Sequence, residues 1–335
     1  MASKSNNSGL AANFPWLVAD IGGSNARFGL ILQADMVVQH IKTIPVISHP
    51  DTASAARAYL ADIAALLGEQ FQAPRKAAFA VATAVAGDKI EFTNSHWSFS
   101  TSAVKAELDL TTFLVLNDFE ALALSLPRLS PSQLKPHDRL PVAKGTLAVI
   151  GPGTGLGVGA VTETSMGWVA LPGEGGHATL SAADDFESAV LSHVRLSYAH
   201  VSAERLLSGI GLPVLHAAVA HVRGVASEIL TAELIVERGL NGSDAICSET
   251  IDSFCALLGS FAGNIALILG ARGGIYIGGG IVPRLGDRFF SSRFRERFEA
   301  KGRFQEYLKN IPTALITDTL AALTGAALAI EQHTA

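Results

Sequence analysis

The segment Pro172-Gly-Glu-Gly-Gly-His177 carries two side chains that could bind a polyhydroxylated molecule. Recognition of a sugar needs fixed carboxylates, amides and imidazoles that each accept from or donate to a hydroxyl, and Glu174 and His177 supply two of these groups. The segment is too Gly-rich to be a helix, so we expect a loop to aim the side chains. Glu-x-x-His is also half of a metal site, but no cluster of Cys, His or carboxylate stands near it in the sequence. The motif therefore favours a sugar over a metal.

Asp118 is the residue that we expect to carry the chemistry. It follows the strand candidate that ends at Asn117 and precedes an apolar helix start at Phe119, and α/β folds place their sites at such strand ends. A carboxylate there can accept the proton of a hydroxyl that attacks phosphorus. An aspartate directly before an apolar helix is also common as the N-cap of that helix, so capping is an alternative role for Asp118. The residues alone leave both roles open.

A weak internal repeat points to a phosphate ligand. When the sequence is aligned with itself, two segments match: Leu17-Val-Ala-Asp-Ile-Gly-Gly-Ser-Asn-Ala-Arg-Phe-Gly29 and Leu147-Ala-Val-Ile-Gly-Pro-Gly-Thr-Gly-Leu-Gly-Val-Gly159. In both copies an apolar strand enters a Gly-rich turn with one hydroxyl residue, Ser24 or Thr154, and a second apolar strand leaves it. Bare backbone N–H groups and a hydroxyl suit an anion. One such turn alone would be an ordinary hairpin, but the duplication favours a pair that holds a polyphosphate.

Neither turn matches the commoner nucleotide signatures. The chain has no Gly-x-x-x-x-Gly-Lys-Ser/Thr, and neither turn gives Gly-x-Gly-x-x-Gly at the start of a helix. P-loop and Rossmann folds are therefore disfavoured.

The elements around these motifs alternate between β-rich runs and helical patterns, which is typical of α/β architecture. One clear helix is predicted between Asp51, its N-cap, and Gly68, where it ends. A second is predicted from an apolar stripe between Ile251 and Leu269. Cys255 lies on this stripe and Cys247 just before it, so both cysteines are expected in the core. Strands are predicted at Trp16–Asp20, Arg27–Leu32, Met36–Ile44, Ala77–Thr83, Lys89–Thr93, Phe113–Asn117, Leu147–Ile150, Gly157–Thr162, Gly167–Ala170 and Gly274–Gly278.

Composition narrows the class of protein. The 335 residues, 49% hydrophobic and 16% charged, exceed what one core usually fills, so we expect two domains. A net charge of −5 argues against a nucleic-acid partner. Two cysteines build neither a disulfide framework nor a zinc cluster, which fits the cytoplasm. The apolar stretch Phe261–Ile281 contains Asn264, Arg272 and Gly pairs, so we expect a buried helix and a strand and no membrane span.

The ordered set of motifs resembles the bacterial glucokinase family from about Trp16 to the C-terminus. Asp20-Ile-Gly-Gly-Ser-Asn-Ala-Arg27 and Gly151-Pro-Gly-Thr-Gly-Leu-Gly-Val-Gly159 are similar to the two phosphate motifs of that family, with Ser24 where the family usually has Thr. Similar segments are also found at Leu116–Ala121, Leu171–His177, His200–Gly209, Gly278–Arg284 and Lys301–Phe304.

The resemblance implies a site for ATP, Mg²⁺ and glucose, with γ-phosphoryl transfer to the 6-hydroxyl of glucose in a homodimeric cytoplasmic enzyme. It adds Asn117 and Glu204 to the sugar contacts, although Glu204 alone would be interpreted as a solvated helix residue beside Arg205. It implies Asp20 as the magnesium ligand, since Mg²⁺ needs few protein ligands, while capping of the turn is the alternative role. The nucleotide contacts implied are Asp20, Gly22, Gly23, Ser24, Asn25, Arg27, Gly153, Thr154, Gly155, Gly279 and Gly280.

The fold implied is the two-domain α/β fold of actin, hexokinase and Hsp70, with an interdomain cleft. We expect a disordered extension over 1–13, a small domain over 14–128 completed by 318–335 with a last helix at Asp318–Glu331, and a large domain over 129–317.

An actin- or Hsp70-like ATPase should lack the set of Glu174, His177 and Glu204. A sugar-sensing repressor would need a DNA-binding segment before the first phosphate motif, and kinases of that related family carry a Cys-rich zinc motif after the sugar-binding His, whereas no Cys precedes Cys247 here.

Overall fold

A computed structural model describes residues 14–92 and 95–334. The extension expected over 1–13 lies outside the described residues, as does Thr93, the last residue of one predicted strand. The chain divides into two compact units. Unit 1 comprises the described residues up to Ser125 together with those from Thr319 onward, and unit 2 is Leu126–Asp318.

Unit 1 contains a five-stranded sheet in the order β3-β2-β1-β4-β7. The strands β3, β2 and β1 are antiparallel, whereas β1, β4 and β7 run parallel. Its strands are β1 (Trp16–Ile21), β2 (Asn25–Ile31), β3 (Val38–Pro45), β4 (Lys76–Val81) and β7 (Thr112–Asn117), with a separate hairpin of β5 (Lys89–Glu91) and β6 (Ser98–Ser100). The central strands are apolar on both faces because helices cover both sides.

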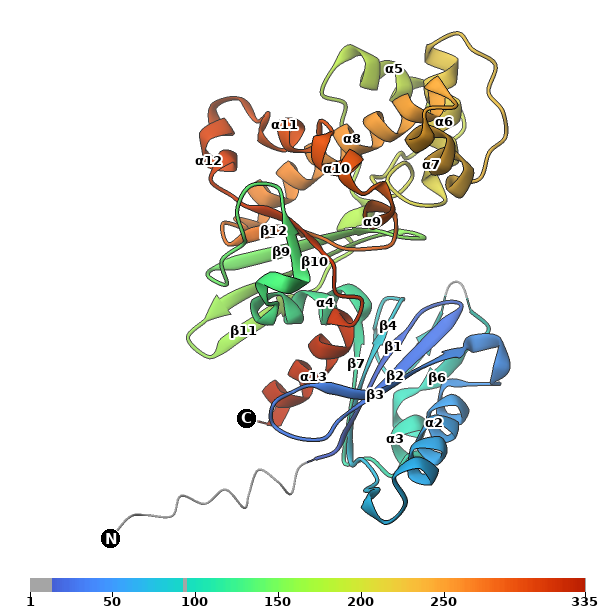
Figure 1. The fold of residues 1–335 in the computed structure, drawn as a ribbon, viewed down its shortest axis with the longest axis vertical. Helices are drawn as coiled ribbons and strands as arrows, with labels where there is room; N and C mark the ends of the chain where they lie inside the picture. Colours follow the sequence, from blue (N-terminus) through green and yellow to red (C-terminus); the bar gives the residue numbers. More distant parts are fainter. Residues whose placement is uncertain (1–13, 93–94, 335) are drawn as a thin grey trace. The chain divides into compact units, whose positions relative to one another are not determined.

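The helices of unit 1 are α2 (Thr52–Leu67), α3 (Thr101–Glu107), α4 (Asp118–Ser125) and α13 (Ala321–Thr334). Figure 1 shows α2 and α3 on one side of the sheet and α4 and α13 on the other. The predicted N-cap of α2 is confirmed, since Asp51 accepts a hydrogen bond from the backbone N–H of Ser54 and the helix ends at Gly68. The last helix begins at Ala321, three residues later than Asp318, the predicted start.

Close packing joins α4 to α13. A Cβ atom on Gly325 would stand only 1.6 Å from the backbone oxygen of Ala121, so α13 approaches α4 where only glycine fits. The prediction that the Ala- and Gly-rich last helix packs closely against a neighbour is confirmed. Since Asp118 is the first residue of α4, this packing also supports the element that carries it.

Unit 2 contains a six-stranded sheet in the order β11-β10-β9-β12-β13-β8. Its core repeats the pattern of unit 1, because an antiparallel hairpin, β9–β10, is followed by the parallel strands β12 and β13. The strands are β8 (Leu134–Pro136), β9 (Thr146–Pro152), β10 (Leu156–Thr164), β11 (Gly167–Leu171), β12 (Gly274–Ile277) and β13 (Thr313–Ile316). The internal repeat of the sequence thus falls on β1–β2 and β9–β10.

Helix α8 forms the centre of the helical layer of unit 2 (Figure 1). It is long and apolar enough to cross a membrane, but 78% of its most apolar window is buried, as expected of a core helix. Cys247 and Cys255 are buried in it, and burial raises the pKa of the Cys247 thiol to about 11. The helices of unit 2 are α5 (Asp185–Val194), α6 (Gly211–Val222), α7 (Ala232–Asn241), α8 (Ala245–Leu269), α9 (Ile281–Leu285), α10 (Asp287–Ser291), α11 (Phe294–Glu299) and α12 (Gln305–Lys309).

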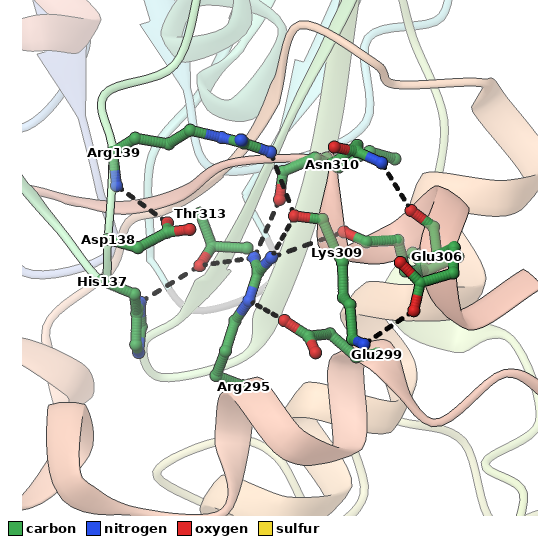
Figure 2. Close-up of polar contacts among 11 residues, drawn as sticks. His137, Asp138, Arg139, Arg295, Glu299, Glu306, Lys309, Asn310 and Thr313 are labelled. Atoms are coloured by element: carbon green, nitrogen blue, oxygen red, sulfur yellow. Dashed lines mark hydrogen bonds and ion pairs between the residues drawn. The ribbon is translucent and has the colours of Figure 1, made fainter.

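Every strand predicted from the sequence is present, but β6, β8 and β13 were not predicted. Figure 2 shows the polar network that holds β13. Arg295 donates to the backbone oxygens of Lys309 at 3.0 Å and Ile311 at 2.8 Å and to Oγ1 of Thr313 at 3.3 Å, and Thr313 also contacts Nδ1 of His137 at 3.1 Å. Contacts with distant segments thus fix this strand of four residues, and its own sequence gives no sign of these contacts.

Candidate functional site

The first Gly-rich turn joins β1 to β2 in unit 1. The backbone N–H of Gly22 donates to the oxygen of Asn25 at 2.9 Å, and the oxygen of Ser24 accepts from the N–H of Val46 at 2.9 Å. Ser24 and Asn25 are exposed at the tip, and Gly22 and Gly23 are partly exposed. The turn therefore presents a hydroxyl, an amide and accessible backbone, as a phosphate-binding tip requires.

Asp20 and Arg27 are cross-strand partners at the base of this turn. Burial raises the pKa of the Asp20 carboxyl, and the positive charge of Arg27 opposes that shift. Arg27 is itself fixed by a hydrogen bond from Nη1 to the backbone oxygen of Thr319 at 2.6 Å. Burial disfavours the ionised form of this carboxylate, and a cation beside it would stabilise that form. Asp20 is therefore suited to the role of a magnesium ligand.

Asn117 and Asp118 lie where β7 ends and α4 begins. Asn117 occupies the residue before the helix, and its Oδ1 accepts from the N–H of Phe119 at 2.9 Å. The amide nitrogen of Asn117 donates to the oxygen of Thr83 at 3.2 Å. Capping of α4 therefore involves Asn117, while Asp118 is the first helical residue, with its own Oδ1 2.9 Å from the N–H of Phe119.

Glu120 is a supporting residue that the sequence analysis missed. Its carboxylate accepts a hydrogen bond from the backbone N–H of Asn117, and burial raises its pKa despite that bond. The spacing Asn117-x-x-Glu120 is that of a capping box, a signal that could have identified it. Glu120 thus fixes the backbone at the junction that carries Asp118.

The second Gly-rich turn joins β9 to β10 in unit 2. The N–H of Gly153 donates to the oxygen of Gly155 at 2.8 Å, and the oxygen of Gly153 accepts from the N–H of Gly209 at 2.8 Å. Thr154 is exposed at the tip. This turn has the same hydroxyl-bearing form as the first, as the repeat predicts.

Gly279 and Gly280 lie next to this second turn, between β12 and α9. Gly279 has a φ of 76°, and a Cβ there would stand 2.3 Å from the oxygen of Pro152. Only glycine combines that backbone conformation with that approach. The structure therefore brings together the nucleotide contacts predicted in unit 2, namely Gly153, Thr154, Gly155, Gly279 and Gly280.

Glu174 precedes a single turn of 3₁₀ helix, η5 (Gly175–His177), and His177 ends it, which corrects the expectation of a loop without helical structure. The correction is small because a three-residue turn needs no helix propensity, only the bond from the N–H of His177 to the oxygen of Glu174 at 3.1 Å. Both side chains are exposed. Gly176 packs against β10, since a Cβ there would stand 2.0 Å from the oxygen of Leu156.

Glu204 lies in a turn, so it is not the solvated helix residue of the alternative interpretation. Its Oε2 accepts from the N–H of Leu156 at 2.9 Å, and its Oε1 is 3.9 Å from Nε2 of His177. Its backbone N–H donates to the oxygen of Gly176 at 2.9 Å. Glu204 therefore joins the second Gly-rich turn to the segment with Glu174 and His177.

Within 14–92 and 95–334, no group of three or more His, Cys, Asp or Glu side chains is arranged to hold a metal ion. His177 and Glu204 instead offer an imidazole and a carboxylate beside the second Gly-rich turn, and Glu174 is exposed just before η5. Such groups can bind hydroxyls and phosphate oxygens in one unit of the protein.

Comparison with known proteins yields a consistent set of matches. A family model described as glucokinase matches residues 17–333. A glucokinase of Chromobacterium violaceum is 47% identical over 98% of this chain and 92% of its own length.

Solved structures show the same similarity. The crystal structure of a glucokinase from an Antarctic psychrotroph has a TM-score of 0.86 at 36% identity and covers 96% of this chain and 99% of its own. A glucokinase of Balamuthia mandrillaris, solved in complex with glucose, has a TM-score of 0.76 at 21% identity, with 97% and 94% covered. These likenesses confirm the predicted actin/hexokinase-like fold.

Proposed function

The chain belongs to the glucokinase family, and from that premise we propose that Asp118 is the general base by which this ATP-dependent sugar kinase phosphorylates the 6-hydroxyl of glucose. The products are glucose 6-phosphate and ADP, the entry step of glycolysis. The observation that supports the sugar kinase function is the position of Glu204, which lies 3.9 Å from His177 and accepts from the N–H of Leu156. Two residues that we propose as sugar ligands therefore lie beside a turn that we propose as a phosphate site.

The sugar hydroxyls are bound by Glu174, His177 and Glu204. Oε1 of Glu204 and Nε2 of His177 are 3.9 Å apart, a separation that leaves their hydrogen-bonding capacity for a ligand. The side-chain amide of Asn117 already donates to Thr83 and accepts from Phe119, so it offers the sugar only its remaining hydrogen-bonding capacity. A missing or inverted hydroxyl would leave such groups unpaired, which is the physical basis of selectivity.

Asp118 accepts the proton of the 6-hydroxyl as that oxygen attacks the γ-phosphorus of ATP. The bond from phosphorus to the bridging oxygen of ATP breaks, and ADP leaves with that oxygen. Asp118 is suited to this role because Asn117 takes the capping position of α4 and Glu120 holds the backbone of the junction. Asn117 and Glu120 thus hold the backbone that carries the base.

The two Gly-rich turns bind the phosphates of ATP through backbone N–H groups, Ser24 and Thr154, and Arg27 adds a positive charge. Asp20 would hold Mg²⁺, mostly through water, since a single carboxylate suffices for an ion that keeps its hydration. When bound, Mg²⁺ would supply charge neutralisation at the phosphate oxygens. The raised pKa of Asp20 supports this role, because a cation would restore the ionised form.

A coupled assay for ADP across glucose, mannose, fructose and galactose, with ATP and magnesium, tests the function. We expect glucose to be phosphorylated far better than fructose or galactose, by up to about 10⁴-fold, because a polar group that loses its water on sugar binding and finds no hydroxyl is left unpaired. Equal rates on these sugars, or ATP hydrolysis that no sugar changes, would contradict the proposal and favour an ATPase.

The proposal also covers the cellular compartment and the oligomeric state of the enzyme. Two free, buried cysteines support the reducing cytoplasm. The family resemblance supports a homodimer, which light scattering of the purified protein would test.

A further inference from the structure

The carboxylate of Glu204 lies against the second Gly-rich turn at a place where the turn has no side chain. Oε2 of Glu204 accepts from the N–H of Leu156 at 2.9 Å. A Cβ atom on Gly155 would stand 2.5 Å from the same oxygen and 3.3 Å from the carboxyl carbon. Real atoms do not approach so closely, so any side chain at position 155 has to displace this carboxylate.

Gly153 differs from Gly155 in this respect. Apart from Gly153 itself and its two chain neighbours, no residue of the described chain has an atom within 4 Å of the position that a Cβ on Gly153 would take. Neither glycine has a positive φ, so alanine suits the backbone at both positions. The two glycines therefore form a matched pair in which only Gly155 has the Glu204 carboxylate as a neighbour.

The main chain around Glu204 cannot easily move away from the turn. The N–H of Glu204 donates to Gly176 at 2.9 Å, and the N–H of Gly209 donates to Gly153 at 2.8 Å. The side chain of Glu204 is 34% exposed and flexible beyond its Cβ. A methyl group at position 155 would therefore be accommodated by rotation of the carboxylate and loss of its bond to Leu156.

We propose that Gly155 is a glucose-positioning residue, because the absence of its side chain lets Glu204 rest on the N–H of Leu156 with Oε1 turned to the sugar. This rests on the proposed function in one respect, the role of Glu204 as a sugar ligand. One turn thus serves two substrates: Gly153 and Thr154 face the phosphates, and Gly155 sets the sugar-binding carboxylate. A substitution in a phosphate-binding turn then changes the affinity for glucose.

Steady-state kinetics of Gly155→Ala and Gly153→Ala test this role. We expect Gly155→Ala to raise the KM for glucose by about 10-fold, the effect of one lost charge-assisted hydrogen bond, with a smaller change in the KM for ATP. Gly153→Ala should show the opposite pattern, with ATP affected more than glucose. If Gly155→Ala raises the KM for ATP and leaves that for glucose unchanged, the positioning role is wrong.

A double-mutant cycle with Glu204→Ala gives the sharper test. Without the carboxylate, the methyl group added at position 155 has room, so Gly155→Ala/Glu204→Ala should have the same glucose KM as Glu204→Ala alone. The melting temperature provides a readout that needs no activity: Gly155→Ala should lower it by roughly 2–4 °C with Glu204 present and hardly at all without it. If Gly155→Ala does not fold, the double variant should still fold, since its clash is gone.

The outcomes separate the two proposals. An equal effect of Gly155→Ala with and without Glu204, in melting temperature and in glucose KM, overturns the positioning role even in an active glucokinase. Absence of glucose phosphorylation by the unsubstituted protein overturns the proposed function instead, and the thermal coupling between positions 155 and 204 can still be measured.

Discussion

Oε1 of Glu204 lies 3.9 Å from Nε2 of His177, and this pair, which we propose as sugar ligands, forms no direct hydrogen bond. Their partners elsewhere keep them in place: Glu204 is held by Leu156, and His177 ends the η5 turn. A hydroxyl between them could donate to the carboxylate and contact the imidazole at once.

This geometry predicts that His177→Ala weakens glucose binding. We expect the KM for glucose to rise by about 10-fold to 100-fold, and the KM for ATP to stay within about twofold, because one hydrogen bond to the sugar is lost. Steady-state kinetics measure both constants. His221→Ala, at an exposed position at the end of α6, is the control and should behave like the unsubstituted protein. Parallel rises of both KM values would argue against a sugar contact.

Asp118→Asn should separate proton transfer from structure. Turnover should fall by roughly 10²-fold to 10⁴-fold, the usual contribution of a positioned general base, because the amide cannot take the proton of the 6-hydroxyl. The melting temperature should hardly change, since Asn117 occupies the capping position of α4. Near-normal turnover at saturating glucose and ATP would show that Asp118 is structural.

Asp20→Asn should increase the requirement for magnesium. The amide is a poorer ligand for Mg²⁺ than a carboxylate, so half-maximal activity should need a higher Mg²⁺ concentration, by about 10-fold. Glucose binding measured by calorimetry without nucleotide should not change. A magnesium dependence equal to that of the unsubstituted protein would assign Asp20 to the turn alone.

Gly325→Ala should destabilise unit 1, although alanine usually stabilises a helix relative to glycine. The added methyl group would meet the backbone oxygen of Ala121 at 1.6 Å, so α13 and α4 would have to separate, at a cost of about 3 kcal/mol. Urea denaturation measures the loss. Thr324→Ala, at a partly exposed position of the same helix, is the control and should change stability by less than about 0.5 kcal/mol. Equal stabilities would mean that the two helices can part at no cost.

His137 should contribute to acid sensitivity. Burial, with help from the charge of Arg295, lowers the pKa of His137 to about 4, while Thr313 and Asp138 act in the opposite direction. The unfolded chain, with an imidazole pKa of about 6.5, then binds more protons than the folded one between these values, so stability falls as the pH decreases from about 6.5 to about 4.

The variant His137→Phe removes this proton while keeping a ring among Phe289, Phe290 and Phe294. The slope of the unfolding free energy over that pH range should decrease by up to about 1.4 kcal/mol per pH unit, as measured by denaturation at several pH values. His216, whose pKa burial also lowers, should keep part of the slope. An unchanged slope would show that His137 does not titrate differently in the two states.

Much of the fold could be predicted because its signals are local. The strands β1, β2, β9 and β10 are apolar runs bounded by glycine turns, and α2 displays its own N-cap and C-cap. The strand β13 was missed because four residues carry too little pattern, and contacts with Arg295 and the neighbouring strands decide its conformation. Glu120 was missed although its capping-box spacing is visible beside Asn117.

The sequence by itself determined the two Gly-rich hairpins, the α/β class and, through family resemblance, the residues of the candidate site. Only the tertiary structure decided that Glu204 rests on Leu156 and that Gly155 must leave it room. The physical reason is that backbone conformation follows from neighbouring residues, whereas the position of a carboxylate depends on chain segments that packing brings together from far apart.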